Sequence, residues 1–546
     1  MDSLIKTYQN RFIESWNEPA LTDYGSGMTL TYGDVAKRIS YLHLLFEQVG
    51  VRPGDRVALC DKNSANWAVS IFAILTYRAV AVPLLTDYSD AQLEMLCEHC
   101  GAGFMVGNKN LSRLWPEGKC PMYLLDTEDL LPMTPTIQTD RIEESLFNRH
   151  FQLYPDGYKK ESISYEAEDS PDDMMLLSYT SGSTGNPKGV MLSYRSLMGN
   201  IEIGIHNLAL RKGENALAIL PLAHMFGLVF DLLFPMAIGA HVYIYNKRMA
   251  PQMLLEALQT VRPRSLRTVP LLMEKIVQNK VLPALQQPMA KRLLRLPLIR
   301  QVIYHKAGRK LRDAFGGNIC QVVLGGAALS QEAATILHRI GFPYRVGYGM
   351  TECGPLIAFS SKGRVPIGSC GKKIGNIDVR ILSDAPSTVA GEILVRGTHV
   401  MLGYYNNSEA TDDVIDADGW MHTGDLGMID RHGFLYIKGR KKNMFLTSNG
   451  QNIYPEEAEE QVVCHTPFDE CVVVQREGRL VAIVYASDAV LKARHLTRQQ
   501  LEQHLEDYCL TANAHLPKYC QLSKFEQRTE EFEKTPKKNI RRFLYK

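Results

Sequence analysis

The sequence predicts an α/β fold in which layered sheets form a large N-terminal part and a smaller α+β unit follows. The chain has 546 residues, which is enough for several packed units. Segments with helical periodicity alternate with short apolar strands over much of the chain, a pattern typical of parallel sheets covered by helices. Around Asp378 the pattern changes to short alternating strands separated by Gly and Asp, which indicates an antiparallel or barrel-like β unit.

The N-terminal elements are predicted from capping residues and apolar spacing. Thr31 can cap a helix whose apolar residues recur as far as Val49, and Gly50 ends it. Residues 57–60 are predicted to form a buried strand and residues 63–78 a helix. Further strand-like runs lie at 79–85, 174–180, 216–220, 241–245 and 320–326. These alternations predict a doubly wound body.

Two longer stretches need separate interpretation. Residues 216–245 are the longest apolar stretch, but they contain His224 and Asp231 and are interrupted by proline and glycine. We therefore expect a core segment and not a membrane span. Residues 131–173 are polar and weakly periodic, which favours an elaborated surface connection.

The C-terminal third divides into two units. Short strands are predicted at 378–382, 392–397, 421–430 and 434–439. Beyond them lie two more strands, at 471–475 and 479–486, and a helix around 499–510. We place a domain boundary between them, so that residues 1–438 form one domain and residues 439–546 the other.

Charge and cysteine usage exclude several classes of protein. The 61 Lys and Arg residues nearly balance the 59 Asp and Glu residues, so no global field attracts nucleic acid or anionic lipid. Eleven scattered cysteines and an N-terminus without an apolar leader predict a reducing, cytoplasmic location. Cys97 and Cys100 have metal-like spacing, but no second pair completes a zinc site, so buried free thiols are expected.

The segment YTSGSTGNPKGV, residues 179–190, has the composition of a phosphate-binding loop. It follows an apolar strand and precedes a predicted helix at 193–204, which predicts a strand-to-helix turn. Its glycines allow backbone N–H groups to approach an anion, its hydroxyls add donors, and Lys188 adds charge. It is not a Walker A loop, because Pro187 precedes the lysine and Gly189 follows it.

Five further motifs follow this loop in order. They are PLAHMFG at 221–227, GGAAL at 325–329, GYGMTECGP at 347–355, GWMHTGDLGMID at 419–430 and GRKKNMFLTSNGQNIYPEEAE at 439–459. With them the chain resembles the AMP-forming acyl-adenylate superfamily of acyl-CoA synthetases, luciferases and adenylation domains. The run GEILVRGTHVMLGYYNN at 391–407 looks most like the long-chain fatty acyl-CoA ligase branch.

The resemblance implies an ATP-dependent acid–thiol ligase. A carboxylic acid, expected to be a medium- or long-chain fatty acid, attacks the α-phosphorus of ATP. The acyl adenylate then passes its acyl group to the thiol of coenzyme A, releasing AMP and pyrophosphate. Because two anions approach and a more charged anion leaves, the reaction requires Mg²⁺, cations and hydrogen-bond donors. A phosphopantetheine arm on a carrier protein presents the same thiol and is the alternative acceptor.

The resemblance also assigns roles to individual residues. Thr184 and Glu352 would hold magnesium and its waters and act in catalysis, Tyr348 would stack on adenine, and Asp425 would accept from the ribose hydroxyls. Arg440 would contact ribose or phosphate. The full ATP-binding set comprises Ser181, Gly182, Ser183, Thr184, Gly185, Lys188, Gly325, Gly326, Ala327, Tyr348, Gly349, Thr351, Asp425 and Arg440.

Acyl binding and domain motion are assigned in the same way. By resemblance, His224 and Gly227 border the acyl site, although His224 suits a satisfied core histidine equally well. The small C-terminal domain is expected to be mobile and to rotate between two half-reactions about Lys442.

The C-terminal loop departs from the family pattern. A lysine normally precedes the apolar residue here occupied by Ile540, but Asn539 stands in its place. Either Lys538 reaches in as the catalytic lysine, or the first half-reaction is slow and the protein is a weakened nucleotide-binding homologue. Losing one such donor typically costs on the order of 10²–10³ in rate. Arg78 stands where a glycine is usual and is expected to affect packing only.

A basic run at 291–312 is the remaining candidate interaction surface. It contains eight Lys and Arg residues and no acid. A solvated basic helix face is one interpretation, and peripheral contact with the inner face of a membrane is the other. Nucleic-acid binding is not expected, because aromatic residues are not interleaved with the charges.

Overall fold

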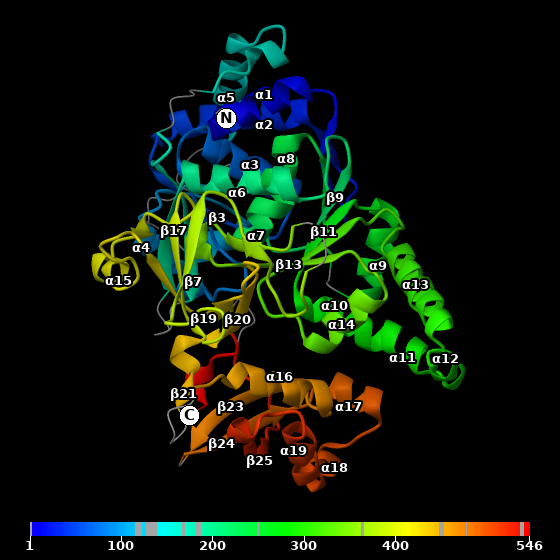
Figure 1. The fold of residues 1–546 in the computed structure, drawn as a ribbon. Coiled ribbons are helices and arrows are strands. Elements are labelled where there is room, and N and C mark those ends of the chain that lie inside the picture. Colours follow the sequence, from blue (N-terminus) through cyan, green and yellow to red (C-terminus); the bar gives the residue numbers. More distant parts are fainter. Residues whose placement is uncertain are drawn as a thin grey trace.

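The computed structural model describes residues 3–114, 123–126, 139–165, 170–181, 187–247, 250–361, 365–446, 452–476, 478–535 and 540–545. These residues form a large layered α/β body and a smaller α+β unit that lies below it in Figure 1. The predicted α/β fold class is confirmed, with its large N-terminal and small C-terminal parts.

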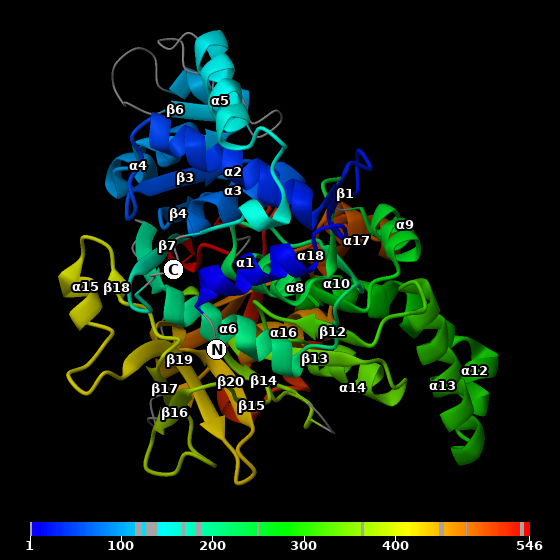
Figure 2. The same cartoon turned by 90° about the horizontal axis from the view of Figure 1, so that it is seen from above.

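The first sheet has seven strands in the order β18-β8-β7-β4-β3-β5-β6. Their bounds are β3 Arg56–Cys60, β4 Val80–Pro83, β5 Phe104–Gly107, β6 Tyr123–Asp126, β7 Met174–Ser181, β8 Pro187–Ser193 and β18 Gly403–Tyr404. The helices α2 (Tyr32–Gln48), α3 (Ala65–Thr76) and α4 (Asp90–Cys100) accompany it, and α5 (Thr139–Leu153) packs on α2 (Figure 2). As predicted, Thr31 caps α2, through a reciprocal bond with Asp34.

The second sheet has nine strands in the order β15-β14-β13-β12-β11-β9-β10-β1-β2. Its bounds are β1 Pro19–Asp23, β2 Thr29–Thr31, β9 Asn215–Ala218, β10 His241–Ile244, β11 Ser265–Thr268, β12 Gln321–Leu324, β13 Tyr344–Gly349, β14 Leu356–Phe359 and β15 Lys372–Lys373. The strands from β1 to β13 pair in parallel, and antiparallel strands close both edges. Near it lie α1 Leu4–Glu14, α6 Tyr194–Asn207, α8 Phe234–Ile238, α9 Pro251–Val261, α10 Pro270–Ile276 and α14 Gln331–Arg339.

The apolar stretch at 216–245 is part of the core. It forms β9, the short helix α7 (Met225–Gly227), a π-helical turn at Leu228–Leu233, α8 and β10. Asp231 in this turn pairs with Arg267 of β11, and both side chains are fully buried. Among the residues described, we find no helix with the length and apolar character needed to traverse a bilayer.

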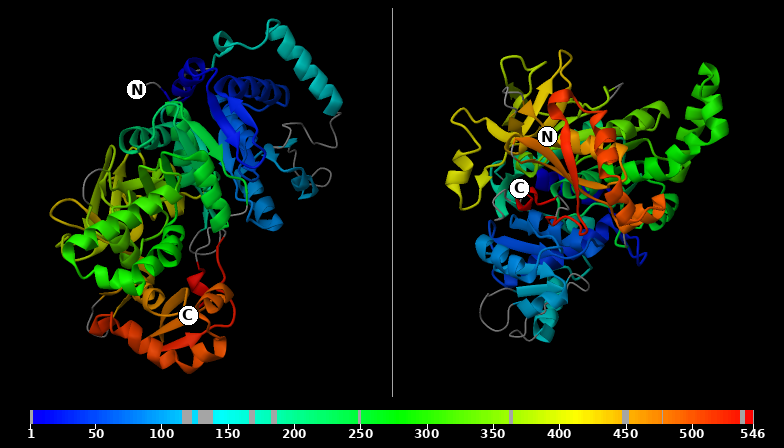
Figure 3. Two further views of the ribbon diagram at one scale, coloured as in Figure 1. Left: turned by 90° about the vertical axis from the view of Figure 1, so that its right-hand side faces the viewer. Right: turned by 90° about the horizontal axis from the view of Figure 1, so that it is seen from below.

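The β unit and the small C-terminal unit follow. Strands β16 (Ile377–Leu382), β17 (Gly391–Gly397), β19 (Met421–Ile429) and β20 (Leu435–Arg440) form the predicted antiparallel sheet, and α15 (Ser408–Asp412) lies beside β18. The small unit, seen at the bottom of Figure 3 (left), has its own core. It contains β21 Phe445–Leu446, β22 Asn452–Ile453, α16 Pro455–His465, β23 Glu470–Arg476, β24 Arg479–Tyr485, α17 Asp488–Arg494, α18 Arg498–Gln503, α19 Leu505–Asn513 and β25 Leu522–Gln527.

One prediction about the phosphate loop is wrong. The residues after it form β8, which pairs antiparallel with β7 from Met174↔Ser193 to Ser181↔Pro187, so the loop joins a hairpin. The helix α6 begins only at Tyr194, where the Ser193 hydroxyl accepts from the Ser196 N–H. The loop is therefore followed by a strand and not directly by a helix N-terminus.

Two predicted helices are interrupted. The helix expected around 499–510 is split into α18 and α19 at His504, whose ψ of 18° leaves the helical region. The basic run spans α12 (Pro288–Leu293) and α13 (Pro297–Ala314), which Pro297 separates, and α11 (Leu282–Gln286) precedes them. These three helices form an arm at one side of the body in Figure 1, and α12 and α13 project from it in Figure 2.

The structure also bears on two smaller predictions, for Arg78 and for the cysteine pair Cys97 and Cys100. The prediction that Arg78 affects packing only is wrong. Its φ of 65° lies in the left-handed region that glycine adopts without cost, so a side chain here strains the backbone. Its guanidinium lies 3.4 Å from the Asp173 carboxylate. Cys97 and Cys100 lie on α4, and both side chains are buried.

Candidate active site

The candidate site is organised by the segment that follows β13. Tyr348 and Gly349 end this strand, and the turn Thr351–Cys353 carries Glu352 back toward the interior. A Cβ atom on Gly349 would lie 2.0 Å from the carbonyl oxygen of Pro355, so the close backbone approach requires glycine. Tyr348 and Glu352 thereby face two different groups of partners.

The first group brings together three of the predicted nucleotide residues. The Tyr348 hydroxyl donates to Asp425 Oδ2 at 2.7 Å, and Arg440 Nε lies 2.8 Å from Asp425 Oδ1. Asp425 and Arg440 are opposite each other in β19 and β20, so sheet register sets this contact. Burial raises the pKa of the Asp425 carboxyl, and Arg440 opposes this shift. The predicted roles in adenine and ribose binding remain predictions.

The second group joins Glu352 to Lys188. The Tyr404 hydroxyl donates to Glu352 Oε1 at 3.1 Å, and Lys188 Nζ lies 4.6 Å from the centroid of the Tyr404 ring. Burial, and then the Glu352 carboxylate, raise the pKa of Tyr404 well above its ordinary value, so its hydroxyl stays protonated. We did not single out Tyr404 from the sequence, although it lies in the run GYYNN.

A third group connects two predicted motifs. Gly325, Gly326 and Ala327 follow β12, and the Gly325 N–H donates to the Thr268 carbonyl at 3.2 Å. A Cβ atom on Gly325 would lie 3.2 Å from the Phe226 ring, so PLAHMFG and GGAAL are neighbours. Phe226 therefore fills part of the space beside Gly325.

The predicted acyl-site residues lie in the same region. His224 is half-buried at the start of α7. Gly227 is buried, and a Cβ atom there would lie 2.4 Å from the Pro221 carbonyl oxygen. The close backbone contact accounts for this glycine, and roles for both residues in acyl binding remain predictions.

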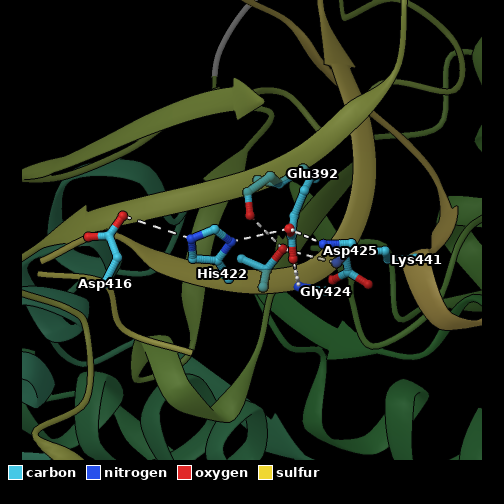
Figure 4. A network of polar contacts seen from close by, with 8 residues as sticks. Glu392, Asp416, His422, Gly424, Asp425 and Lys441 are labelled. Atoms are coloured by element: carbon cyan, nitrogen blue, oxygen red, sulfur yellow. Dashed lines mark hydrogen bonds and ion pairs between the residues drawn. The ribbon is translucent and has the colours of Figure 1, made fainter. Parts of the chain in front are cut away.

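A further polar network lies one residue from Asp425 (Figure 4). The buried Glu392 carboxylate accepts from Lys441 Nζ at 2.8 Å, from His422 Nδ1 at 3.1 Å and from the Gly424 N–H at 3.2 Å. Burial acts to raise the pKa of Glu392, but the hydrogen bonds from Lys441 and His422 outweigh it and hold the pKa below its ordinary value. Lys441 begins the turn Lys441–Asn443 that contains the predicted hinge Lys442.

Several predicted residues lie outside the described residues. Gly182, Ser183, Thr184 and Gly185 of the loop do so, as do Lys538 and Asn539; the backbone of Ser181 ends β7. Among the described residues, no group of three or more His, Cys, Asp or Glu side chains could hold a metal ion. Magnesium usually takes one or two carboxylates together with substrate phosphates and waters, and the hard oxygens of Glu352 fit that donor set.

Comparison with known proteins agrees with these motifs. The family model described as "AMP-binding enzyme" matches residues 13–405. A long-chain-fatty-acid–CoA ligase of Mycobacterium bovis is 29% identical over 470 residues, covering 82% of this chain and 75% of that protein. A 4-coumarate–CoA ligase of Oryza sativa is 28% identical over 499 residues, covering 88% of this chain and 84% of that protein.

Solved structures share the fold over nearly the whole chain. ATP-bound MatB from Rhodopseudomonas palustris has a TM-score of 0.75 at 20% identity, covering 98% of this chain and 97% of that one. O-succinylbenzoate coenzyme A synthetase (MenE) from Bacillus subtilis, in complex with AMP, has a TM-score of 0.75 at 22% identity, covering 100% and 98%. Because the family model spans more than half of the residues, this chain belongs to the AMP-binding enzyme family.

Proposed function

We propose that this protein activates a medium- or long-chain fatty acid with ATP and transfers the acyl group to coenzyme A. The main support is that one motif, residues 347–355, serves two neighbouring groups. Its Tyr348 binds Asp425 directly, and its Glu352 is connected to Lys188 through Tyr404. The branch motif at 391–407 and the names of the first relatives support a fatty acid. Other relatives are named for 4-coumarate and ferulate, so an aromatic acid is the alternative substrate.

The residues have complementary tasks in the first half-reaction. Lys188 and the loop donors of residues 181–185 would bind the β- and γ-phosphates, and Asp425 would orient the nucleotide by accepting from ribose hydroxyls. Glu352, with Thr184, would hold Mg²⁺, which neutralises charge on the phosphates. Arg440 pairs with the Asp425 carboxylate and opposes the rise in its pKa that burial causes. The fatty acid would approach from the side of His224 and Gly227.

The second half-reaction requires the thiol to reach the acyl adenylate. We take residues 439–546 as a mobile domain that turns about Lys442 after the first step. The contact between Lys441 and Glu392 restrains the chain beside this position. The contacts Gln331–Glu460 and Lys438–Glu457 join the two parts, and the rotation would have to break them. Lys441 and Lys442 are exposed.

Measurement of AMP release across free acids of increasing chain length, with and without coenzyme A, tests the proposal. We expect release to need both ATP and acid, to be greatest with medium or long chains, and to yield a thioester only when coenzyme A is present. Preference for an aromatic acid would contradict the fatty-acid assignment. Thioester formation on a phosphopantetheine carrier, but not on coenzyme A, would contradict the acceptor.

The C-terminal lysines distinguish an active enzyme from a weakened homologue. Lys538→Ala should lower pyrophosphate release more than the neighbouring Lys537→Ala, because Lys538 lies nearer the family position at Asn539. Wild-type release from Lys538→Ala would exclude Lys538 as the catalytic lysine. ATP binding by the wild type without any pyrophosphate release would identify a non-catalytic nucleotide-binding protein.

We also propose that the arm α11–α13 contacts an anionic membrane surface. This arm exposes large apolar side chains, with Met289 of α12 76% and Val302 of α13 66% exposed. Most of the basic residues at 291–312 are exposed, and none of them forms an ion pair within the described chain. An apolar, projecting and basic arm suits a lipid interface better than an aqueous one.

Vesicle co-sedimentation tests this contact. We expect the protein to bind vesicles containing phosphatidylserine, with binding weakened by salt and by Val302→Ser, but to leave phosphatidylcholine vesicles unbound. Leu510→Ser on α19 is the matched control, because Leu510 is similarly exposed but lies on the small unit. Equal sedimentation of wild type and Val302→Ser would contradict the proposal.

A further inference from the structure

We propose that Tyr404 is a positioning residue that holds both the Glu352 carboxylate and the Lys188 ammonium for the magnesium–triphosphate group. The inference rests on the proposed function, since it needs Glu352 and Lys188 to serve the metal and the phosphates. It adds a residue outside the predicted set and gives the two predicted ones a shared support.

The backbone around Tyr404 is fixed to both of the elements that it would support. Leu402 N–H donates to the Met191 carbonyl at 2.9 Å, and Tyr405 N–H donates to the Gly189 carbonyl at 2.7 Å. Both acceptors belong to β8, the strand that carries Lys188. On the other side, Met401 N–H donates to the Glu352 carbonyl at 2.8 Å. Tyr404 therefore has a defined position between the phosphate-loop hairpin and the Glu352 turn.

The hydroxyl fixes the orientation of the carboxylate. Among the described residues, Tyr404 is the one whose side chain donates a hydrogen bond to the Glu352 carboxylate. Glu352 is 9% exposed, so the carboxylate has little water to replace this donor. A hydrogen bond to one oxygen restrains the side chain and leaves the second oxygen available for a metal or its waters.

The ring acts on the lysine in a different way. Lys188 Nζ lies over the ring face at 4.6 Å, within the range of a cation–π contact. No described carboxylate forms an ion pair with Lys188. An aromatic face restrains the ammonium without neutralising it, so its whole charge stays available for an anionic phosphate. A carboxylate in the same place would compete with the phosphates for the lysine.

Two substitutions separate the effects of the hydroxyl and the ring. Tyr404→Phe removes only the bond to Glu352 and preserves the buried ring, whereas Tyr404→Leu removes both contacts. Tyr405→Phe is the matched control, because Tyr405 is the adjacent residue and its ring lies against His99 instead. A residue that served packing alone would tolerate Tyr404→Phe with no change in metal dependence.

Calorimetric titration with ATP in the absence of acid, at a series of Mg²⁺ concentrations, provides a readout without turnover. For Tyr404→Phe we expect the Mg²⁺ concentration at half-maximal ATP affinity to rise about tenfold, as for loss of a hydrogen bond to a charged group, while metal-free ATP binding stays unchanged. Tyr404→Leu should also weaken metal-free ATP binding, because Lys188 loses its support. Tyr405→Phe should match the wild type.

A double-variant cycle shows whether Tyr404 acts through Glu352. In a Glu352→Gln background, Tyr404→Phe should have no further effect on the Mg²⁺ midpoint. The inference would be overturned if Tyr404→Phe were as thermally stable as the wild type and had the same Mg²⁺ midpoint, while the wild type itself bound ATP. This outcome would leave the proposed function intact. Absence of magnesium-dependent ATP binding in the wild type would instead overturn the proposed function itself.

Discussion

At the scale of single residues, Asp231 and Arg267 form a fully buried ion pair outside the site. Arg267 Nε lies 2.6 Å from Asp231 Oδ1, and neither side chain reaches solvent. Burial raises the pKa of Asp231 to about 6 although Arg267 opposes the shift. Each charge therefore offsets part of the desolvation penalty of the other. The pair as a whole is still less favourable than two well-packed apolar side chains of similar volume would be.

Breaking this pair should cost more than replacing it. Arg267→Met leaves a buried carboxylate unpaired and should lower the free energy of unfolding by about 3–5 kcal/mol, whereas Asp231→Leu/Arg267→Met should recover most of this loss.

Because the folded pKa of Asp231 lies above its unfolded value, the native state binds more protons between about pH 4 and 6, and its stability falls as the pH rises through that window. Denaturation followed by circular dichroism at several pH values measures both effects. Equal loss in the single and double variants would contradict the prediction.

At the scale of elements, the ion pair between Lys441 and Glu392 connects the turn Lys441–Asn443 to the β unit. Lys441 is 59% exposed while its partner Glu392 is buried, so the pair is screened on one side. Lys441→Met should raise hydrogen exchange of amides at 440–446 by about threefold, as expected for a partly exposed ion pair. Lys442→Met is the control and should leave exchange unchanged. Identical exchange in both variants would show that the Glu392 contact does not restrain the turn.

The pH dependence of the same contact has a definite sign. The pKa of Glu392 is depressed in the folded protein, so its contribution to stability is present above its unfolded pKa and is lost as the pH falls through the folded value. The slower exchange of the turn should therefore be lost at acidic pH in the wild type. Lys441→Met should show a weaker dependence, because one of the two side-chain donors that lower the pKa is gone.

The sequence predicts those elements whose formation depends on local signals. The α2 helix combines a capping residue, apolar periodicity and a terminal glycine, and it forms as predicted. The strand β8 was missed because it depends on pairing with β7 along its whole length, and a strand after a glycine-rich loop looks locally like the start of a helix. Tertiary pairing decides such short elements.

The same distinction applies to the site. Tyr348, Asp425 and Arg440 could be found because each lies in a motif whose residues are adjacent in sequence. Tyr404 and Glu392 act through partners 52 and 49 residues away, and no spacing rule connects them. The available signals were the tyrosine that follows glycine in GYYNN and the acid inside the apolar strand EILVRG. Neither signal indicates which residue the side chain contacts.

At the scale of the whole molecule, the small unit contributes a carboxylate to a helix of the large body. The first N–H groups of α14 meet two acids: Ser330 N–H donates to Glu274 Oε1 and Gln331 N–H to Glu460 Oε1, both at 2.8 Å. Glu274 belongs to α10 of the large body and Glu460 to α16 of the small unit. Unpaired N–H groups and the positive end of the helix dipole favour both carboxylates.

A pocket of ≈ 450 Å³ lies at the same junction. It is bounded by the arm, by α14 and by α16, with Tyr304, Arg339, Glu460 and His465 among its lining residues. Lys438 of β20 also lies 2.8 Å from Glu457. The two parts therefore meet through polar contacts around a cavity, an arrangement that separates more easily than an apolar interface.

The Glu460 cap makes the contact between the two parts dependent on pH. Burial raises the pKa of Glu460, the bond from Gln331 N–H opposes this, and the neighbouring Glu274 and Glu457 raise it further. The docked arrangement therefore binds a proton more tightly than the separated one, and lowering the pH should favour docking. The protection factor of the Gln331 amide, measured by hydrogen exchange and corrected for intrinsic rates, should rise relative to that of Ser330 as the pH is lowered from neutrality toward 4.5, the ordinary pKa of a glutamate. Glu460→Gln keeps an acceptor oxygen but has no titrating proton, so protection of the Gln331 amide should persist and its pH dependence should vanish. Glu460→Ala removes the charged acceptor and should lower Gln331 protection about tenfold. Protection of Gln331 that is independent of pH in the wild type, or equal in Glu460→Ala, would show that this cap does not hold the two parts together.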